Sequence, residues 1–391
     1  MKFSENIEQV LESSKKATRR RTPSIYEKYG YLDNPFPTKS YPIWKRFHNQ
    51  EDVKEAFESQ VLNYIGRDQK NTTFFLLGGN RIGKTHFLKH HFLELEGVFR
   101  KRKVHYFPSI FIKAPPGEFL QNYRDIILEI NHHYEEIIGE EFFLQFLKRI
   151  KEKQDIIEKM PKDDLWRALN KLHSVSLPIS TGDFWGLYPI FMKWLEGATL
   201  EKNEKQRIGV FSPLKTSSTC ISVLKRIIRI GRDEGIIKGL IVFLDEFEVL
   251  WQVARVEKRA RYLQDLREFI DEIPNGLFFV VAMTEEAEHN LEEEYVALYG
   301  RLSSPSAPYI LKPIQGTEDA WGYANYFLEE ARKEFEEARN IRSEEGHIIS
   351  KAEVIEELEK VTPELKSSQG DFFDALHELV ESKVKGANQT G

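Results

Sequence analysis

The stretch "GGNRIGKTHF" (residues 78–87) lies between the apolar run "TTFFLL" (72–77) and a segment whose apolar residues have helical spacing. It fits the pattern Gly-x-x-x-x-Gly-Lys-Thr, whose glycines let backbone N–H groups curl around a phosphate. The helix that starts at this turn points the positive end of its dipole at the anion. The pattern therefore predicts a turn that binds a nucleoside triphosphate, lined by Gly78, Gly79, Asn80, Arg81, Ile82, Gly83, Lys84, Thr85 and His86.

Two residues of this turn have a predicted chemical role of their own. Lys84 is expected to reach the β- and γ-phosphates and to act in catalysis, and the hydroxyl group of Thr85 is expected to bind Mg²⁺. The guanine signature Asn-Lys-x-Asp does not occur in the sequence, which favours ATP. A glycine turn followed by a surface lysine is the alternative interpretation.

An acidic pair follows a second apolar run, in "LIVFLDEFE" (240–248). Ligands of open α/β sheets bind at the carboxyl edge of the strands, where Asp245 and Glu246 would lie. We expect Asp245 to orient the Mg²⁺ shell and Glu246 to polarise an attacking water molecule. A solvated acidic turn is the alternative, and Glu248 is a weaker candidate that suits a helix start.

A third polar strand end occurs in "LFFVVAMT" (277–284). Thr284 follows this apolar run, where its hydroxyl group would sense the γ-phosphate or position the water molecule. Ordinary termination of the strand is the alternative interpretation.

The order of apolar runs and helical segments predicts an α/β sandwich around a parallel sheet. Residues 118 to about 235 form a mostly helical insertion, with a Pro/Gly/Ser-containing break over 174–189, and the pattern is helical again from Glu318 to about Val384. We predict a basic, extended leader (1–45), a phosphate-loop domain (46–315) and a helical lid (316–391). The expected strands are 72–79, 104–116, 239–246, 275–284 and 307–314.

The composition is that of a globular protein with a substantial core. Of 391 residues, 41% are hydrophobic and 30% are charged, and the formal net charge is −6. No apolar run approaches the roughly 18–20 residues that span a bilayer, and the N-terminus lacks the apolar core of a signal peptide. The single cysteine, Cys220, is interpreted as a small buried residue rather than a nucleophile. These features predict a cytoplasmic protein that does not contact membranes.

Three further groups of residues are candidate contacts for DNA or metals. The run Lys15–Arg21 carries five cations in seven residues, and Arg226, Arg229 and Arg232 share one helical face. Both groups are candidates for phosphate contacts, with a solvated tail as the alternative for Lys15–Arg21. The histidine pairs 90–91 and 132–133 are interpreted as lacking Cys or carboxylate at metal-ligand spacing, so no zinc site is expected.

The order of phosphate loop, "FLDE", polar strand end and helical lid resembles the AAA+ superfamily of P-loop ATPases. The segment "NPFPTKSYPIWKRFHNQEDVKEAF" (34–57) is similar to the one that precedes the phosphate loop in the origin-recognition/Cdc6-like branch. The combination of "GKTHFLKHHF", "LIVFLDEFEVL", "KRARYLQDLREFIDEIPNGLFFVVAMT" and "YVALYGRL" resembles the ATP-binding proteins of BREX-type phage-defence systems.

These resemblances imply Mg-dependent ATP hydrolysis that drives a conformational change in a DNA- or protein-associated assembly, in phage defence or genome maintenance. They imply a homo-oligomer or a partner of defence proteins, in which Arg301 reaches the γ-phosphate of a neighbouring subunit. A surface arginine, or Arg226, Arg229 or Arg232 in that role, are the alternatives. By the same likeness, Asn34, Pro35 and Phe36 would lie near the adenine, with a packing role of the prolines as the alternative.

One departure from the resemblance concerns the lid. Origin-recognition relatives read Gly-Asp-x-Arg at a lid helix, whereas this chain reads Gly370-Asp371-Phe372-Phe373. The missing arginine favours an alternative function of another class, a slow-hydrolysing ATP-operated switch or scaffold that recruits effectors. A kinase that uses the same loop has less support, because a glutamate after the metal aspartate favours water as the acceptor.

Overall fold

The computed structural model describes residues 25–67, 70–114, 118–175, 182–273, 275–304, 306–341, 346–361 and 366–389. The chain divides into two compact units. The larger unit is Gln50–Lys312, and the smaller unit combines Met1–Asn49 with Pro313–Gly391.

A parallel five-stranded sheet with the order β2-β3-β4-β1-β5 forms the centre of the larger unit. The three central strands β1, β3 and β4 are buried along almost their whole length, as expected for a parallel sheet covered on both faces. The P-loop α/β fold predicted from the sequence is confirmed. The strands are β1 (Thr72–Leu77), β2 (Ser109–Lys113), β3 (Leu240–Asp245), β4 (Leu277–Met283) and β5 (Tyr309–Ile310).

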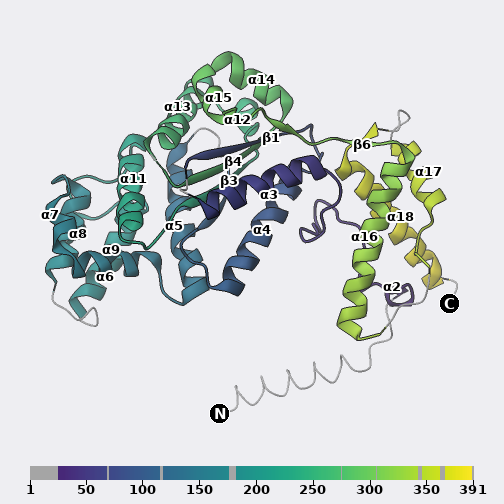
Figure 1. Ribbon diagram of the computed structural model, residues 1–391, viewed down its shortest axis with the longest axis horizontal. Helices are drawn as coiled ribbons and strands as arrows, with labels where there is room; N and C mark the ends of the chain where they lie inside the picture. Colours follow the sequence, from purple (N-terminus) through teal and green to yellow (C-terminus); the bar gives the residue numbers. More distant parts are fainter. Residues whose placement is uncertain are drawn as a thin grey trace, which may run out of the picture. The chain divides into compact units, whose positions relative to one another are not determined.

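Helices cover both faces of this sheet, as Figure 1 shows. On one face lie α3 (Glu51–Gly66) and α4 (Lys84–Arg102), and the Phe57 ring of α3 packs 5.1 Å from that of Phe74 in β1. The opposite face of β1, with Phe75 and Leu77, packs into the core shared with α5, α13 and α15. Alternate residues of β1 therefore pack against the helices on the two opposite faces of the sheet. The elements of the second layer are α5 (Phe119–Ile138), α12 (Val249–Val253), α13 (Val256–Glu272), α14 (Glu285–Glu294) and α15 (Val296–Leu302).

The insertion between β2 and β3 is helical, as predicted, and its core is continuous with that of the sheet. One detail of the prediction is wrong. The break expected over 174–189 is shorter, because α9 begins at Gly182 and continues through Pro189, while residues 176–181 lie outside the described residues. Buried Phe184 and Phe191 favour helix here over the Pro and Gly signals. Besides α5, the insertion comprises α6 (Phe142–Glu152), α7 (Gln154–Glu158), α8 (Asp164–Ser174), α9 (Gly182–Leu195), α10 (Lys202–Ile208) and α11 (Ser217–Asp233).

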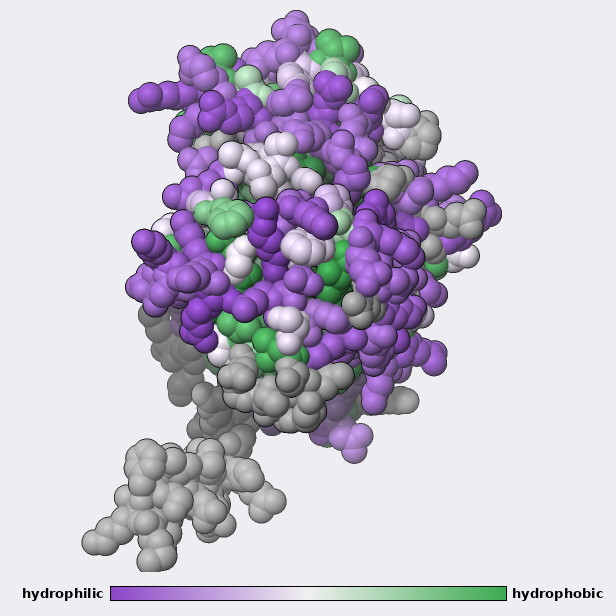
Figure 2. Space-filling model, turned by 90° about the vertical axis from the view of Figure 1, so that its left-hand side faces the viewer, coloured by the Kyte–Doolittle hydropathy of each residue, from purple (hydrophilic) through white to green (hydrophobic). Residues whose placement is uncertain are grey.

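The surface of the insertion is mainly hydrophilic. Figure 2 shows this face, on which hydrophobic side chains form small separate patches. Cys220 lies in the interior beneath it, and burial raises the pKa of its thiol to about 12. The cysteine is therefore a buried core residue, in line with its interpretation from the sequence.

The smaller unit is mainly helical and includes chain segments from both ends of the described sequence. Phe36, from the segment before α3, stacks on Phe373 of α18 with ring centroids 6.4 Å apart. The side-chain amide of Asn34 donates to the backbone oxygen of His377 at 3.1 Å. These residues thus have a packing role within this unit. Its elements are α2 (Ile25–Lys28), α16 (Gly316–Arg339), α17 (Lys351–Val361), α18 (Gln369–Gln389) and the short antiparallel pair of β6 (Ile314–Gln315) and β7 (Lys366–Ser367).

None of the helices in the described parts of the chain is long and apolar enough to cross a membrane.

Candidate functional site

The phosphate loop connects the end of β1 at Leu77 to the start of α4 at Lys84. Gly83 has a φ of 100°, a region that side-chain-bearing residues rarely adopt. At Gly78, a methyl group would lie 3.1 Å from Cγ2 of Ile82 and 3.4 Å from Cβ of Leu311. The two outer glycines of the pattern are thus required by the conformation of the loop and by its close packing.

Lys84 lies against the inside of this loop. Its ammonium group is buried and donates to the backbone oxygens of Gly78 at 2.9 Å and Gly79 at 3.0 Å. The same nitrogen lies 3.5 Å from Oε1 of Glu248, which precedes α12. Glu248 was the weaker candidate in this segment, with a helix start as the favoured interpretation, and its proximity to the loop lysine was not predicted. Its spacing of three residues from Asp245 was the available signal.

Asp245 ends β3 and is 1% exposed. Neither of its carboxylate oxygens has a hydrogen-bond partner among the described residues. Burial raises the pKa of this carboxyl group, and the side chain of Thr85, lying beside it, acts in the opposite direction without forming a hydrogen bond of normal geometry. A buried carboxylate without a partner, next to a hydroxyl group, is a donor set that suits a divalent cation such as Mg²⁺.

Glu246, the next residue along the chain, is more exposed than Asp245. It accepts a hydrogen bond from Lys113 Nζ at 2.7 Å, and the side chains of the lysine and the glutamate are 60% and 42% exposed. The parallel register of β2 and β3 sets Lys113 opposite Asp245, which explains the contact. The sequence could not reveal this lysine, because it lies 133 residues from Glu246 along the chain.

Thr284 follows β4, the strand between β1 and β3, so the three polar strand ends lie at one edge of the sheet. Its hydroxyl oxygen accepts a hydrogen bond from Ala287 N at 3.2 Å and caps the N-terminus of α14. The hydroxyl proton remains available for a ligand.

The predicted arginines lie elsewhere in the larger unit. Arg301 on α15 is half-exposed and donates from Nε to Oδ1 of Asp271 at 2.6 Å. Arg226 is paired with Asp163 at 2.6 Å, and the Arg232 guanidinium group lies beside Gly276. Arg229 is exposed, so these three arginines of α11 have separate environments. The basic run Lys15–Arg21 lies outside the described residues.

The interpretation that the histidine pairs lack carboxylates at metal-ligand spacing is wrong. Glu94 lies 3.5 Å from His90 and 3.4 Å from His91, four and three residues away on the same helix. Glu136 lies 3.5 Å from His132, four residues away, and Glu96 of α4 lies 3.0 Å from His133 of α5. A helix brings residues three and four apart together, so the contacts of Glu94 and Glu136 were visible in the sequence, whereas that of Glu96 with His133 depends on the packing of two helices.

Two cavities, of about 840 and 480 Å³, occur among the insertion helices. None of their lining residues belongs to the phosphate loop or to the acidic strand end. They are therefore separate from the predicted nucleotide site.

Comparison with known proteins agrees with this geometry over part of the chain. Residues 187–304 match the family described as BREX system ATP-binding protein BrxC/D. This range includes β3 with Asp245 and the segment that carries Arg301. No curated protein matches the chain. Among solved structures, the Walker-type ATPase PABY2304 of Pyrococcus abyssi is similar at 14% sequence identity and a TM-score of 0.38, over 92% of this chain and 75% of that one.

The match covers three of the four motifs on which the resemblance to BREX proteins was based, namely those at 240–250, 258–284 and 295–302. The phosphate loop at 78–85 lies outside the matched range and is placed by the strand order and the loop geometry. The chain therefore has a parallel α/β fold with a P-loop sequence between β1 and α4, and its residues 187–304 resemble the ATP-binding proteins of BREX phage-defence systems.

Proposed function

We propose that the chain binds ATP together with Mg²⁺ and hydrolyses it to ADP and phosphate, and that this cycle drives a conformational change in a phage-defence assembly. The observation that carries the proposal is the buried, unpartnered carboxylate of Asp245 beside Thr85 at the mouth of the phosphate loop. An isolated buried charge costs free energy, and a bound cation removes that cost. The match of residues 187–304 to BREX ATP-binding proteins supports the biological setting.

Each residue of the site would contribute a separate part of the chemistry. Lys84 would exchange its contacts with Gly78, Gly79 and Glu248 for the phosphate oxygens and neutralise their charge. Thr85 and Asp245 would hold the Mg²⁺ ion, which when bound supplies further neutralisation of the phosphates. Glu246 would accept a proton from the attacking water molecule. Thr284, at the next strand end, would donate its hydroxyl proton to the γ-phosphate or to that water molecule.

Two substitutions test hydrolysis and binding separately. Lys84→Ala is expected to lower kcat/KM for ATP at least about a hundredfold, because it removes a preorganised charge from the reacting phosphates. Glu246→Gln is expected to lower kcat by about 10²–10⁴-fold while calorimetry still detects ATP binding, because the amide keeps the shape but is a poor base. Both are measured as phosphate release over a range of Mg-ATP concentrations that extends from below KM to saturation.

The matched controls are Lys101→Ala, an exposed lysine in the last turn of the same helix, and Glu285→Gln, an exposed acid just after β4. Neither is expected to change turnover. Unchanged activity in both Lys84→Ala and Glu246→Gln would refute the proposal.

The ion pair between Lys113 and Glu246 favours a second candidate function, the slow-hydrolysing switch or scaffold. A carboxylate that is held by an ammonium group must leave it before it can contact an attacking water molecule. The lid position at which relatives carry an arginine is occupied by Phe373, which is buried among aromatic residues of the smaller unit. A multiple-turnover rate above about 1 s⁻¹, ordinary for enzymes, would exclude this candidate.

A further inference from the structure

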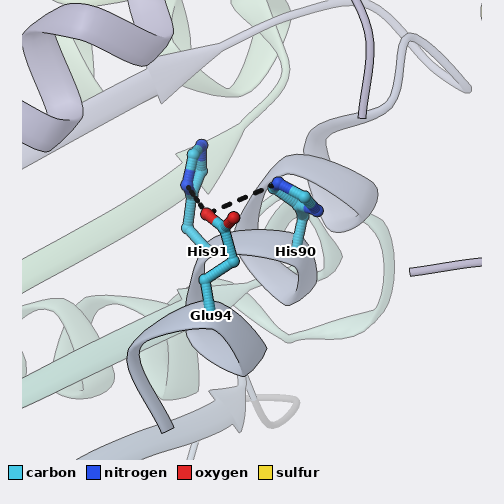
Figure 3. A group of neighbouring side chains, drawn as sticks. All are labelled: His90, His91 and Glu94. Atoms are coloured by element: carbon cyan, nitrogen blue, oxygen red, sulfur yellow. Dashed lines mark ion pairs between the residues drawn. The ribbon is translucent and has the colours of Figure 1, made fainter. Parts of the chain in front are cut away.

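Helix α4 carries a compact group of three potential metal ligands, His90, His91 and Glu94, downstream of the phosphate loop. Successive residues of an α-helix are about 100° apart around the axis, so the fourth residue after His90 returns to about 40° from it. Around the helix axis, Glu94 therefore lies between the two histidines, and along the axis it lies about one turn beyond them. Figure 3 shows both imidazole rings directed at the Glu94 carboxylate.

The distances within this group are those of a metal coordination shell. His90 Nε2 lies 3.5 Å and His91 Nδ1 lies 3.4 Å from the same carboxylate oxygen, Oε2 of Glu94, and the three ligand atoms lie within 4.8 Å of one another. Around a tetrahedral ion with bonds of about 2.0–2.1 Å, neighbouring ligand atoms are separated by about 3.3–3.4 Å. The two distances from Glu94 to the histidine nitrogens therefore fit such a coordination shell with almost no rearrangement.

The surrounding packing holds the imidazole rings in place. The ring of His91 packs between Phe57 and Phe87, with centroids 4.6 and 4.4 Å away, and is 2% exposed. His90 is also buried and meets His91 edge-on at 5.1 Å. Fixed ligands lose little conformational entropy on binding an ion. Glu94 is 58% exposed, so the group is open to solvent on one side.

We propose that His90, His91 and Glu94 form a zinc-binding site, with solvent as the remaining ligand. Two imidazole nitrogens and one carboxylate select Zn²⁺ over Mg²⁺ and Ca²⁺, which prefer oxygen ligands only. The ion would join the second turn of α4 to α3 through the contact of His91 with Phe57, and so stiffen the helix that begins with Lys84 and Thr85. The site is separate from the residues proposed for nucleotide binding and does not depend on ATP hydrolysis.

Cobalt provides a spectroscopic probe for this site. The full chain, treated with a chelator and dialysed, is titrated with Co²⁺ while visible d–d absorption is recorded, and Zn²⁺ is then added in competition. We expect one equivalent of Co²⁺ with tetrahedral absorption that Zn²⁺ displaces. Glu94→Gln is expected to weaken binding of both ions at least about tenfold, because it removes a charged ligand from an exposed position where the fold tolerates the change. Zn²⁺ is expected to raise the Tm of the unsubstituted chain and not that of the variant.

Two comparison variants make the result specific. Glu293→Gln removes the carboxylate of the His289–Glu293 pair, which has the same helical spacing and a distance of 3.3 Å but is exposed on both sides. This variant is expected to bind Co²⁺ as the unsubstituted chain does. Asp245→Asn removes the carboxylate proposed to hold Mg²⁺, and the Co²⁺ absorption is expected to persist in it. Binding that survives Glu94→Gln, that disappears with Asp245→Asn, or that is never displaced by Zn²⁺ would show that the three residues form only a histidine–glutamate ion pair.

Discussion

Three acidic residues lie at or just after the carboxyl end of β3, and each has a different environment. Asp245 is buried and its oxygens have no hydrogen-bond partner in the described parts of the chain, Glu246 pairs with Lys113, and Glu248 lies near Lys84. Burial and charge neutralisation therefore differ among residues that are almost adjacent in the sequence. We infer that this difference separates metal binding from base catalysis within one turn of chain.

The pairing of Glu246 makes a prediction at the level of single residues. Lys113→Ala is expected to raise kcat for ATP by about 1.4- to fivefold, the factor that corresponds to the 0.2–1 kcal/mol of an exposed ion pair. The physical reason is that the carboxylate of Glu246 no longer has to leave an ammonium group before it can contact the attacking water molecule. Steady-state phosphate release at saturating Mg-ATP measures it.

Lys159→Ala is the control for Lys113→Ala, because it removes an exposed ion pair of 2.9 Å with Asp155 in the insertion and should leave kcat unchanged. A fall in kcat with Lys113→Ala would mean that the lysine assists the reaction instead of restraining Glu246.

Between elements, buried polar contacts fix the ends of strands and helices. Tyr262 of α13 donates to Asn122 of α5 at 2.7 Å, and Asn122 donates to the backbone oxygen of Lys113 at 3.1 Å. This chain of contacts ties two helices to Lys113 at the end of β2, the residue whose side chain pairs with Glu246. In the smaller unit, the hydroxyl group of Tyr26 on α2 donates to the carboxylate of Glu381 on α18.

The contact between α2 and α18 makes a prediction about stability. The Tyr26 hydroxyl group lowers the pKa of Glu381, so this bond stabilises the folded chain above the ordinary glutamate pKa and loses its effect as pH falls through the lowered value. Tyr26→Phe is expected to reduce the free energy of unfolding by about 1 kcal/mol at pH 7. The loss should begin to shrink near pH 4, where glutamate in the unfolded chain becomes protonated, and should approach zero once the pH is below the lowered pKa of Glu381. Thermal melts across this pH range measure both effects.

Tyr29→Phe provides the comparison, since Tyr29 is 39% exposed and lies three residues away. It should cost almost nothing at any pH. A Tyr26→Phe penalty that stays constant down to pH 3 would show that the tyrosine stabilises the unit by packing and not through the Glu381 carboxylate.

For the whole molecule, the proposed assembly depends on Arg301. The arginine is half-exposed and held by Asp271, which also lies 3.3 Å from Arg267. If it acts on the nucleotide of a neighbouring subunit, Lys84→Ala and Arg301→Ala should each abolish hydrolysis, while a mixture of the two should regain activity. In a randomly mixed ring about one interface in four combines an intact loop with an intact arginine, so about a quarter of the full rate is expected.

The assay for this prediction is phosphate release from the one-to-one mixture after the subunits have been allowed to exchange. Arg267→Ala, which shares the same aspartate, should keep full activity. An Arg301→Ala variant with full activity, or a mixture no more active than its components, would assign Arg301 to the surface of its own chain.

The elements that the sequence predicted well depend on local signals. The strand expected at 72–79 occurs as β1 (Thr72–Leu77), two residues shorter, because an unbroken apolar run reports burial directly. The break over 174–189 was placed wrongly, since burial of Phe184 and Phe191 favours helix despite Pro189. The β6–β7 pair was missed because two-residue strands carry no periodic signal.

By itself, the sequence determined the phosphate loop, the acidic strand end and their position at the carboxyl edge of a parallel sheet, because glycines, apolar runs and strand order act locally or through general rules of topology. Only the tertiary structure decided which charges meet there. Lys113 reaches Glu246 through the register of two strands that are separated by the whole insertion. The fixed orientation of His91 toward Glu94 likewise depends on Phe57 from another helix. Contacts between distant segments arise from packing, which no local pattern encodes.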